Sequence, residues 1–224
     1  SARIRATRGS ARPGRRRVGL STHVQGLSSD RKRVEVFFHA SGEVYLAPSD
    51  EGETLVACLY WADALPEGSN NEQRVLKTLR SVAALHDRCG EIVFTTPVLG
   101  AGPLGISLRN PVSDPVVLVG DASGAPDPVT GEGMSLALLS ARPLADALAS
   151  GDPRAYIPER RRLGGNAGWL SRWILRTSRH RIVAERIIGS LAKHPDLFSK
   201  LMEVGSGVRR PRDLGLVDLF RLVS

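Results

Sequence analysis

The segment VVLVGDASGAPDPVTGEGM, residues 116–134, holds the residue types in this chain that could do chemistry. An acidic side chain, Asp121, follows an apolar run, and Gly131 and Gly133 precede a stretch rich in Leu, Ala, Ser and Met. Glycines leave the amide groups at the start of a helix accessible, and that end of a helix carries a partial positive charge. The segment therefore predicts a site for an anionic or electron-rich ligand.

A buried strand and a long helix are expected to position these residues. The apolar run 116–119 predicts a short strand that is buried on both faces. The run 134–149 favours a helix, with Arg142 and Asp146 on its exposed side. The carboxylate at the end of the strand would then lie close to the start of the helix.

This stretch resembles the second flavin-contacting motif of FAD-dependent monooxygenases and geranylgeranyl-reductase-type oxidoreductases, written GD…DPxTGEG. The resemblance implies that Asp121 holds the ribityl chain of FAD. It also implies that the backbone at Pro128, Gly131 and Gly133 lies against the isoalloxazine ring. The amides of Gly133 and Met134 would face the N1/C2 carbonyl edge, where fixed N–H dipoles stabilise the negative charge of reduced flavin. The implied cofactor-binding residues are Gly120, Asp121, Pro128, Thr130, Gly131, Glu132, Gly133 and Met134.

Other motifs of the resembled family are not found before this segment. A βαβ unit with GxGxxG and an acidic residue for the adenosine ribose would be expected there. The resemblance covers the chain from about residue 15 onward and is specific only around 120–134. We therefore expect the C-terminal part of a larger flavoprotein, or a truncated gene product. The alternative is a plain strand–loop–helix connection in which Asp121 caps the helix.

A second glycine pattern, GAGPLG at residues 100–105, matches GxGxxG by its letters alone. A dinucleotide site needs these glycines to open a helix. Here Ile106 and Leu108 follow, and then Asn110-Pro111 marks a turn. The pattern predicts a bend between two strands.

The order of elements predicts an α+β fold, an α/β flavoprotein fragment in which a mixed, largely antiparallel sheet with helices precedes a C-terminal helical region. Residues 1–17 form a basic arm without strands, and 18–110 a substrate-type mixed sheet domain. Residues 111–150 form the C-terminal piece of an FAD-binding domain, and 151–224 a helical tail.

Short turns between strand candidates predict antiparallel neighbours in the sheet domain. The expected strands are 33–39, 43–47, 54–61, 91–98 and 104–109. A capping pattern at Ser69, Asn70, Asn71 and Glu72 begins a helix that reaches about His86. Aromatic residues gather in the first three strands and could line a pocket or fill an ordinary core: Phe37, Phe38, Tyr45, Tyr60 and Trp61.

The net charge of +8 belongs to the start of the chain. Residues 1–33 hold ten Lys or Arg and one Asp, and the rest of the chain is close to neutral. No aromatic residue interrupts this basic segment, so sequence-specific nucleic-acid recognition is not expected. A disordered tail is the preferred interpretation.

The C-terminal third is expected to be helical, with a break at Gly164-Gly165 and a short terminal helix within 191–207. Between them, 169–191 is amphipathic and rich in Arg, so it could contact a membrane surface or a partner. The preferred alternative is packing of its apolar stripe on the cofactor domain. No signal sequence or membrane-spanning run is found, which favours a cytoplasmic protein.

The sequence thus predicts an FAD-dependent oxidoreductase, most simply of monooxygenase type, acting on a small apolar organic substrate with NADH or NADPH as electron donor. A flavin-dependent reductase of isoprenoid double bonds is an alternative. A truncated, non-catalytic binding domain with a basic arm is the alternative from another class. Cys58, Cys89 and the five histidines show no metal-ligand spacing. No catalytic acid or base, and no oligomeric state, is indicated.

Overall fold

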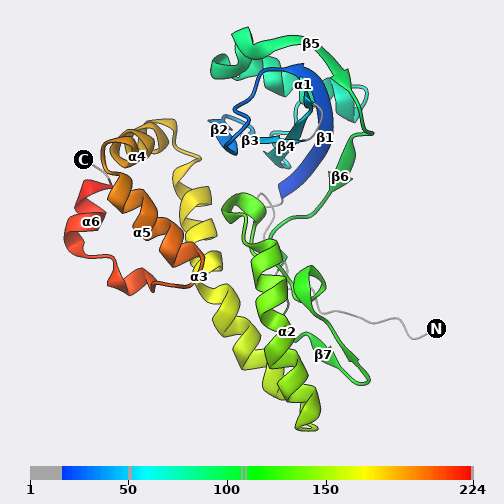
Figure 1. The fold of residues 1–224 in the computed structure, drawn as a ribbon, viewed down its shortest axis with the longest axis vertical. Helices are drawn as coiled ribbons and strands as arrows, with labels where there is room; N and C mark the ends of the chain where they lie inside the picture. The colour runs from blue at the N-terminus through cyan, green and yellow to red at the C-terminus, as the bar shows by residue number, and fades with distance from the viewer. Residues whose placement is uncertain (1–16, 50–51, 107, 109, 223–224) are drawn as a thin grey trace. The chain divides into compact units, whose positions relative to one another are not determined.

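The computed structural model describes residues 17–49, 52–106, 108 and 110–222, which fall into two compact units (Figure 1). The first unit ends at Leu104 and the second begins at Gly105. The predicted α+β class, with a largely antiparallel sheet and a C-terminal helical region, is confirmed. The predicted basic arm lies outside the described residues, except for Arg17.

An antiparallel sheet forms the centre of the first unit. Its strands follow the order β2–β3–β4–β1–β5, and β6 also pairs with β1. The predictions of strands at 33–39, 43–47 and 54–61 are confirmed as β2, β3 and β4. The bounds are β1 (Arg17–Leu27), β2 (Glu35–His39), β3 (Gly42–Pro48), β4 (Thr54–Trp61), β5 (Cys89–Phe94) and β6 (Leu99–Ala101).

The longest strand, β1, was not predicted. It begins at Arg17, where the sequence suggested a basic arm without strands, and it pairs with β4, β5 and β6. Its alternation is present in the sequence, because Leu20 and Val24 face the core while Ser21 and His23 face the other side. The density of arginines before it masks this pattern.

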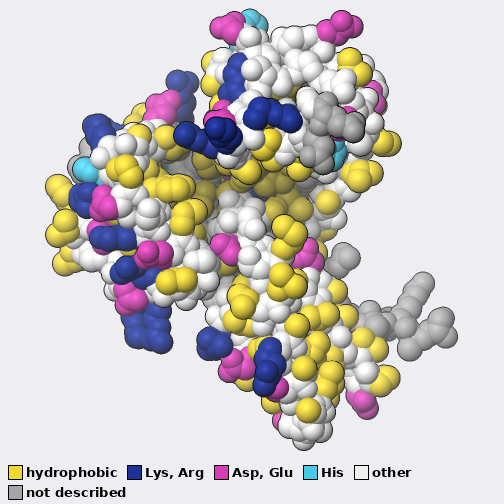
Figure 2. Space-filling model, in the orientation of Figure 1, with side chains coloured by type: hydrophobic (Ala, Val, Ile, Leu, Met, Phe, Trp, Pro, Cys, Tyr) yellow, Lys and Arg dark blue, Asp and Glu magenta, His cyan; other side chains and the backbone are white. Residues whose placement is uncertain are grey.

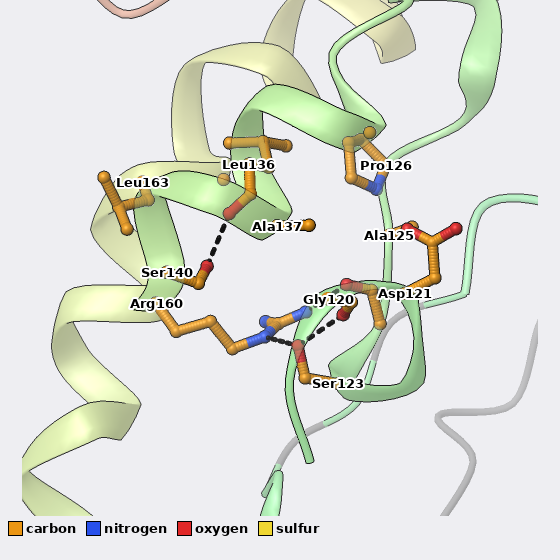
Figure 3. A pocket seen from close by; sticks show the side chains of 13 residues that line it. Gly120, Asp121, Ser123, Ala125, Pro126, Leu136, Ala137, Ser140, Arg160 and Leu163 are labelled. Atoms are coloured by element: carbon orange, nitrogen blue, oxygen red, sulfur yellow. Dashed lines mark hydrogen bonds between the residues drawn. The ribbon is translucent and has the colours of Figure 1, made fainter. Parts of the chain in front are cut away.

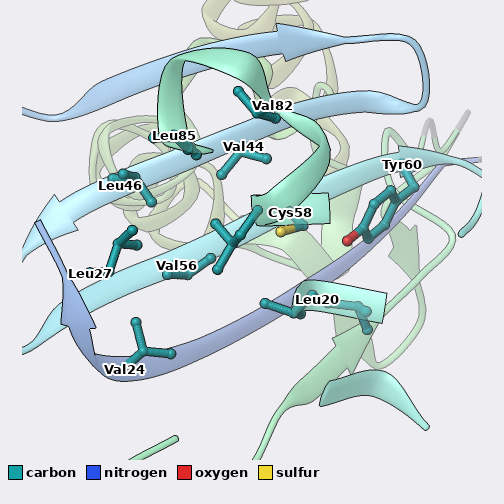
Figure 4. Close-up of a cluster of buried hydrophobic side chains, with 12 residues drawn as sticks. Leu20, Val24, Leu27, Val44, Leu46, Val56, Cys58, Tyr60, Val82 and Leu85 are labelled. Atoms are coloured by element: carbon teal, nitrogen blue, oxygen red, sulfur yellow. The ribbon is translucent and has the colours of Figure 1, made fainter. Parts of the chain in front are cut away.

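Helix α1 (Asn71–Ser81) covers one face of the sheet and closes a hydrophobic core (Figure 4). Val44 and Val56 from the sheet and Leu79 from α1 are fully buried in this core. The predicted helix to His86 is too long, because α1 ends at Ser81 and the 3-10 helix η2 (Ala83–Arg88) follows. Sequence placed the start correctly, since Asn70 caps the helix.

The cap of α1 uses a different partner from the predicted one. Asn70 Oδ1 accepts a hydrogen bond from the Gln73 amide at 2.9 Å, and the Ser69 amide donates to Gln73 Oε1 at 3.0 Å. Asn70 is therefore the N-cap, and Gln73 reaches back to the Ser69 amide, one residue before the cap, so the predicted box between Ser69 and Glu72 does not form.

An ion pair ties η2 to the edge of the sheet. Arg88 donates to the two carboxylate oxygens of Glu35 at 2.9 and 2.6 Å, and its Nε donates to the Ser28 carbonyl at 2.8 Å. The hydrogen bond from Arg88 lowers the pKa of Glu35 below its ordinary value of 4.5. The pair therefore stabilises the fold above that pH.

We expect this stabilisation to disappear in acid. As the pH falls below about 4.5, the unfolded chain takes up the Glu35 proton before the folded chain does, so the free energy of unfolding decreases. Glu35→Gln should lower the unfolding free energy by about 1 kcal/mol at pH 7 and flatten its decline between pH 5 and 3. Urea unfolding across that range measures this, with the exposed Glu67→Gln as the control. Parallel pH profiles for the two variants would contradict the role of Glu35.

The second unit consists of a small hairpin and a set of helices. The hairpin strands are β7 (Val112–Ser113) and β8 (Val116–Val117). The longer helices are α2 (Gly133–Ala149), α3 (Tyr156–Thr177), α4 (Arg181–Lys193), α5 (Pro195–Gly205) and α6 (Leu216–Arg221). Short 3-10 turns join them: η3 (Gly120–Ser123), η4 (Pro128–Thr130), η5 (Pro153–Ala155) and η6 (Pro211–Asp213).

The expectation of a strand at 116–119 buried on both faces is wrong. Strand β8 spans only Val116–Val117, pairs antiparallel with β7 and is half-buried, while Val119 is 42% exposed. The physical reason is that, within the described part of this unit, β8 has only the two residues of β7 beside it. Four apolar residues in a row indicate burial, but they do not say which segment provides it.

The helix breaks also differ from prediction. Helix α3 continues through Gly164-Gly165, and the chain breaks instead between Thr177 and Arg181. The predicted stretch 169–191 is thus divided between α3 and α4. Burial decides the outcome, because the packing of α3 against its neighbours outweighs the cost of about 1 kcal/mol for each glycine. The predicted terminal helix within 191–207 is present as α5.

The helices α3 and α5 share a second core. Leu170 of α3 packs with Leu197, Leu201 and Val204 of α5, all at most 3% exposed. Ile187 of α4 also belongs to this core, whereas Ile182 of the same helix is 68% exposed. The apolar stripe therefore packs on α5, within the predicted helical tail, and not on the 111–150 piece as the preferred interpretation expected. In the described residues, no helix combines the length and the apolar character needed to cross a bilayer.

Candidate cofactor-binding site

The predicted motif forms a compact loop against the start of α2. Asp121 lies in η3, and one of its carboxylate oxygens is 3.9 Å from the position that a Cβ on Gly133 would occupy. The carboxylate therefore lies beside the first residue of α2, as the sequence predicted. Helix α2 has 17 residues, so it is long enough to present a full dipole at this end.

The 3-10 turn η4 shapes the loop between Asp121 and α2. Asp127 is 7% exposed and caps η4, since its Oδ1 accepts a hydrogen bond from the Val129 amide at 3.2 Å. Pro128 occupies the first turn of η4, where the backbone N–H that proline lacks would have no partner within the turn. Gly131 ends η4 with φ +71°, a backbone conformation that other residues rarely adopt. The DPxTG spacing thus builds a specific turn.

The start of α2 is open. A Cβ added at Gly131 would meet no atom within 4 Å, and Met134 is 82% exposed. Glu132 at the N-cap position provides no side-chain cap, and the first turn of α2 contains no acidic residue. The helix end is therefore not covered by its own side chains. A planar, electron-rich ring has room to approach these amides, so the local structure fits a flavin.

The eight predicted site residues are close in the chain but differ in exposure. Four of them are exposed, namely Asp121, Pro128, Gly131 and Met134, and the other four are half-buried, namely Gly120, Thr130, Glu132 and Gly133. A Glu132 carboxylate oxygen lies 3.7 Å from a Cβ built on Gly205, so this side chain is directed toward α5. The structure thus brings Asp121 and Gly133 together and places the Glu132 side chain elsewhere.

A small pocket lies directly behind the loop, between η3, the first turns of α2, and α3 (Figure 3). Ser123, which is 2% exposed, donates its hydroxyl hydrogen bond to the Gly120 carbonyl at 2.7 Å. Arg160 reaches from α3 and donates from Nε to Ser123 Oγ at 2.7 Å and from its terminal nitrogen to the Gly124 carbonyl. These contacts fix the back of the loop that carries Asp121.

Sequence reasoning missed Ser123, Asp127 and Arg160. Asp127 could have been found, because an Asp directly before Pro128 is a typical cap of a short turn. Ser123 and Arg160 gave no such signal. They lie 37 residues apart, and only the packing of α3 brings them into contact.

The GxGxxG letters at 100–105 do not form a nucleotide site. Residues Leu99–Ala101 are strand β6, and Gly105 has φ +66°. No helix begins at the described positions from 102 to 110. The chain bends after β6, as expected, but the predicted second strand at 104–109 is wrong, because positions 104, 105 and 106 form no strand and Leu108 makes only an isolated bridge.

Other chemistry is not evident in the described part of the chain. No group of three or more His, Cys, Asp or Glu residues there could hold a metal ion. Cys58 is buried and Cys89 half-buried, and both are free thiols. Burial raises the pKa of the Cys58 thiol to about 11, so it is not a ready nucleophile.

No protein-family model and no curated protein sequence matches the chain. Its fold is nevertheless found in solved flavoproteins. A flavoprotein/dehydrogenase from Cytophaga hutchinsonii aligns with a TM-score of 0.71 at 16% identity, over 91% of this chain and 52% of its own. A flavin-dependent brominase gives 0.70 at 14%, over 92% and 54%. The halogenase PltM, solved with phloroglucinol and FAD, gives 0.63 at 16%, over 90% and 49%.

These comparisons confirm the predicted resemblance to FAD-dependent flavoproteins at the level of the fold. The chain spans about half the length of each of these proteins. At 13–17% identity the shared fold does not carry their reactions over to this chain.

Proposed function

We propose that the loop around Asp121 and the start of α2 binds the flavin part of FAD in an FAD-dependent oxidoreductase. The observation that carries this proposal is the Asp121 carboxylate beside an open, uncapped helix start. When bound, FAD supplies electron and hydride transfer. The fold shared with flavoproteins supports the same function.

Each residue of the proposed site has a specific role. The Asp121 carboxylate accepts hydrogen bonds from the ribityl hydroxyls, and Gly120 lets the chain turn into η3. The amides of Gly133 and Met134 donate to the electron-rich edge of the ring. The turn at Pro128, Thr130 and Gly131, followed by Glu132, brings bare backbone toward the ring face.

We further propose that this chain supplies only part of the complete FAD site. The apolar face of α2 supports this, because Leu138 is 78% and Leu139 53% exposed. Such an apolar face is usually covered by another segment in a complete domain. The adenosine and pyrophosphate of FAD need a glycine-rich βαβ unit, and the GxGxxG letters present here do not form one. A protein in which such a unit precedes this chain is called the longer protein below.

The proposed reaction is of monooxygenase type, on a small apolar organic substrate and with NADH or NADPH as electron donor. The aromatic residues of the sheet are divided between its two faces. Tyr60 is fully buried beneath α1, and Phe37 packs on the same core. Phe38 and Tyr45 lie on the opposite face, half-buried, and are the candidates to contact a substrate. Reduction of isoprenoid double bonds is the alternative, favoured by the TGEG form of the motif.

We expect the isolated chain to bind FAD weakly and the longer protein to bind it in a 1:1 ratio. The reason is that the chain holds the ring and ribityl contacts but not the adenosine contacts. Quenching of flavin fluorescence during titration measures both. The longer protein is obtained by extending the reading frame upstream of Ser1. Tight 1:1 binding by the isolated chain would contradict the partial site, and a longer protein that binds no FAD would contradict the proposed function.

A further inference from the structure

Arg160 stands apart from the other arginines of α3 by what it contacts. Its guanidinium donates hydrogen bonds to two neutral oxygens, the Ser123 hydroxyl and the Gly124 carbonyl. Within the described residues it makes no ion pair, whereas Arg162 on the same helix pairs with the exposed Glu159 at 2.9 Å. Burial lowers the pKa of Arg160, as expected for a cation that has lost water without gaining a carboxylate. Such a residue carries an energetic cost that its contacts must offset.

The contacts of Arg160 close the loop that carries Asp121. Ser123 links the guanidinium to the Gly120 carbonyl at 2.7 Å, and the Gly124 amide donates to the Asp121 carbonyl at 2.9 Å. Gly124 has φ +98°, and a Cβ there would lie 2.8 Å from the Ile106 carbonyl oxygen and 2.9 Å from Arg160. The five residues from Gly120 to Gly124 are thus held at both ends and in the middle. Figure 3 shows the bonds from Arg160 to Ser123 and from Ser123 to Gly120.

The geometry points to Arg160 as a positioning residue for the cofactor site. It holds the back of η3 against α3, and this keeps the Asp121 carboxylate beside Gly133 without touching the cofactor itself. The inference rests on the proposed function, because the position of Asp121 matters only if that carboxylate binds a ligand. It adds a role for α3, which the sequence motif does not include. An arginine fits here because one planar group reaches two oxygens at once.

Two measurements on matched variants test this role. Arg160→Met removes both donors and keeps an apolar stem, Arg160→Lys keeps the charge but not the fork, and Arg162→Met is the control on the exposed side of α3. Amide hydrogen exchange of the 224-residue chain reports the loop directly. We expect Arg160→Met to speed exchange of the Gly124 amide about tenfold or more, and Arg162→Met to leave it unchanged. The Lys variant should fall between them.

The second measurement is FAD affinity of the longer protein. We expect Arg160→Met to weaken FAD binding about tenfold, with partial recovery in Arg160→Lys and an unchanged FAD affinity in Arg162→Met. Equal FAD affinity in Arg160→Met and Arg162→Met overturns the positioning role, whatever the exchange rates. If Arg160→Met does not fold, the comparison of Arg160→Lys with Arg162→Met decides in the same way. If the unsubstituted longer protein binds no FAD, the proposed function fails, and this inference with it.

Discussion

Asp121→Ala is expected to purify without flavin when it is made in the longer protein. A carboxylate that accepts hydrogen bonds from sugar hydroxyls contributes about 1.5–3 kcal/mol, which corresponds to about a ten- to hundredfold weaker FAD affinity. The bound flavin after purification and the dissociation constant from titration measure the loss. Asp121→Asn keeps one acceptor oxygen, so we expect an intermediate affinity.

The structure separates this effect from simple unfolding. The Asp121 side chain is exposed, and the bond that shapes its turn is made by its backbone carbonyl with the Gly124 amide, which alanine retains. The melting temperature of Asp121→Ala should therefore stay close to that of the unsubstituted protein. Asp146→Ala is a matched control, because Asp146 lies in the last part of α2 in an exposed pair with Arg142. Flavin content equal to that of the control would refute the proposed role of Asp121.

The motif region could be predicted because its structure is determined locally. The turn at η4 follows from Asp127, Pro128 and Gly131 in sequence, and α2 follows from a run of helix-forming residues. The proximity of Asp121 to Gly133 needs only the short loop between them. Most of the candidate site was therefore accessible from the sequence.

The parts that sequence reasoning missed depend on contacts between distant segments. Arg160 meets Ser123 only because α3 packs behind η3, and nothing near residue 160 indicates this. The apolar run 116–119 was expected to be buried, but burial needs neighbouring strands, and the short β7 provides little. Gly164-Gly165 favours a break, yet the packing of α3 maintains the helix. In each case tertiary packing overrides the local preference.

The start of β1 also depends on a contact between distant segments, and here the sequence predicted too little structure. Arg17 belongs by composition to the basic run, but it is 1% exposed and begins β1. Its guanidinium is paired with Glu43 and lies 4.9 Å from the centre of the Trp61 ring. A charged residue is rarely buried unless it is paired, and its partner here is 26 residues away. Only the register of the sheet reveals the pair.

Hydrophobic side chains gather on the outer face of α6, at the left edge of the view in Figure 2. Leu216, Val217 and Phe220 are 86%, 71% and 72% exposed. The inner side of the helix is fixed, since Lys200 binds the Asp218 carboxylate at 2.7 Å and Arg221 binds Asp196 at 3.0 Å. Polar contacts therefore hold α6 in place while Leu216, Val217 and Phe220 face outward.

Glu43→Gln is expected to be the most destabilising polar substitution in the sheet. Both side chains of the Arg17–Glu43 pair are 1% exposed, so water cannot solvate the Arg17 charge when the Glu43 charge is removed. Removing one member of a buried ion pair costs about 3–5 kcal/mol, because the other charge stays in a poorly polarisable surrounding. Urea unfolding of the chain measures the loss as a lower midpoint with an unchanged slope.

Two further variants show whether burial of the charge is the cause. Glu185→Gln breaks a pair with Arg181 in which the side chains are 61% and 89% exposed, so we expect less than about 0.5 kcal/mol. Replacing Arg17 and Glu43 together by Leu removes both charges and should recover much of the stability lost in Glu43→Gln. An equal cost for Glu43→Gln and Glu185→Gln would show that the Arg17 charge remains well solvated in the fold. A double variant as unstable as Glu43→Gln would instead assign the cost to packing, since the buried charge is absent from it.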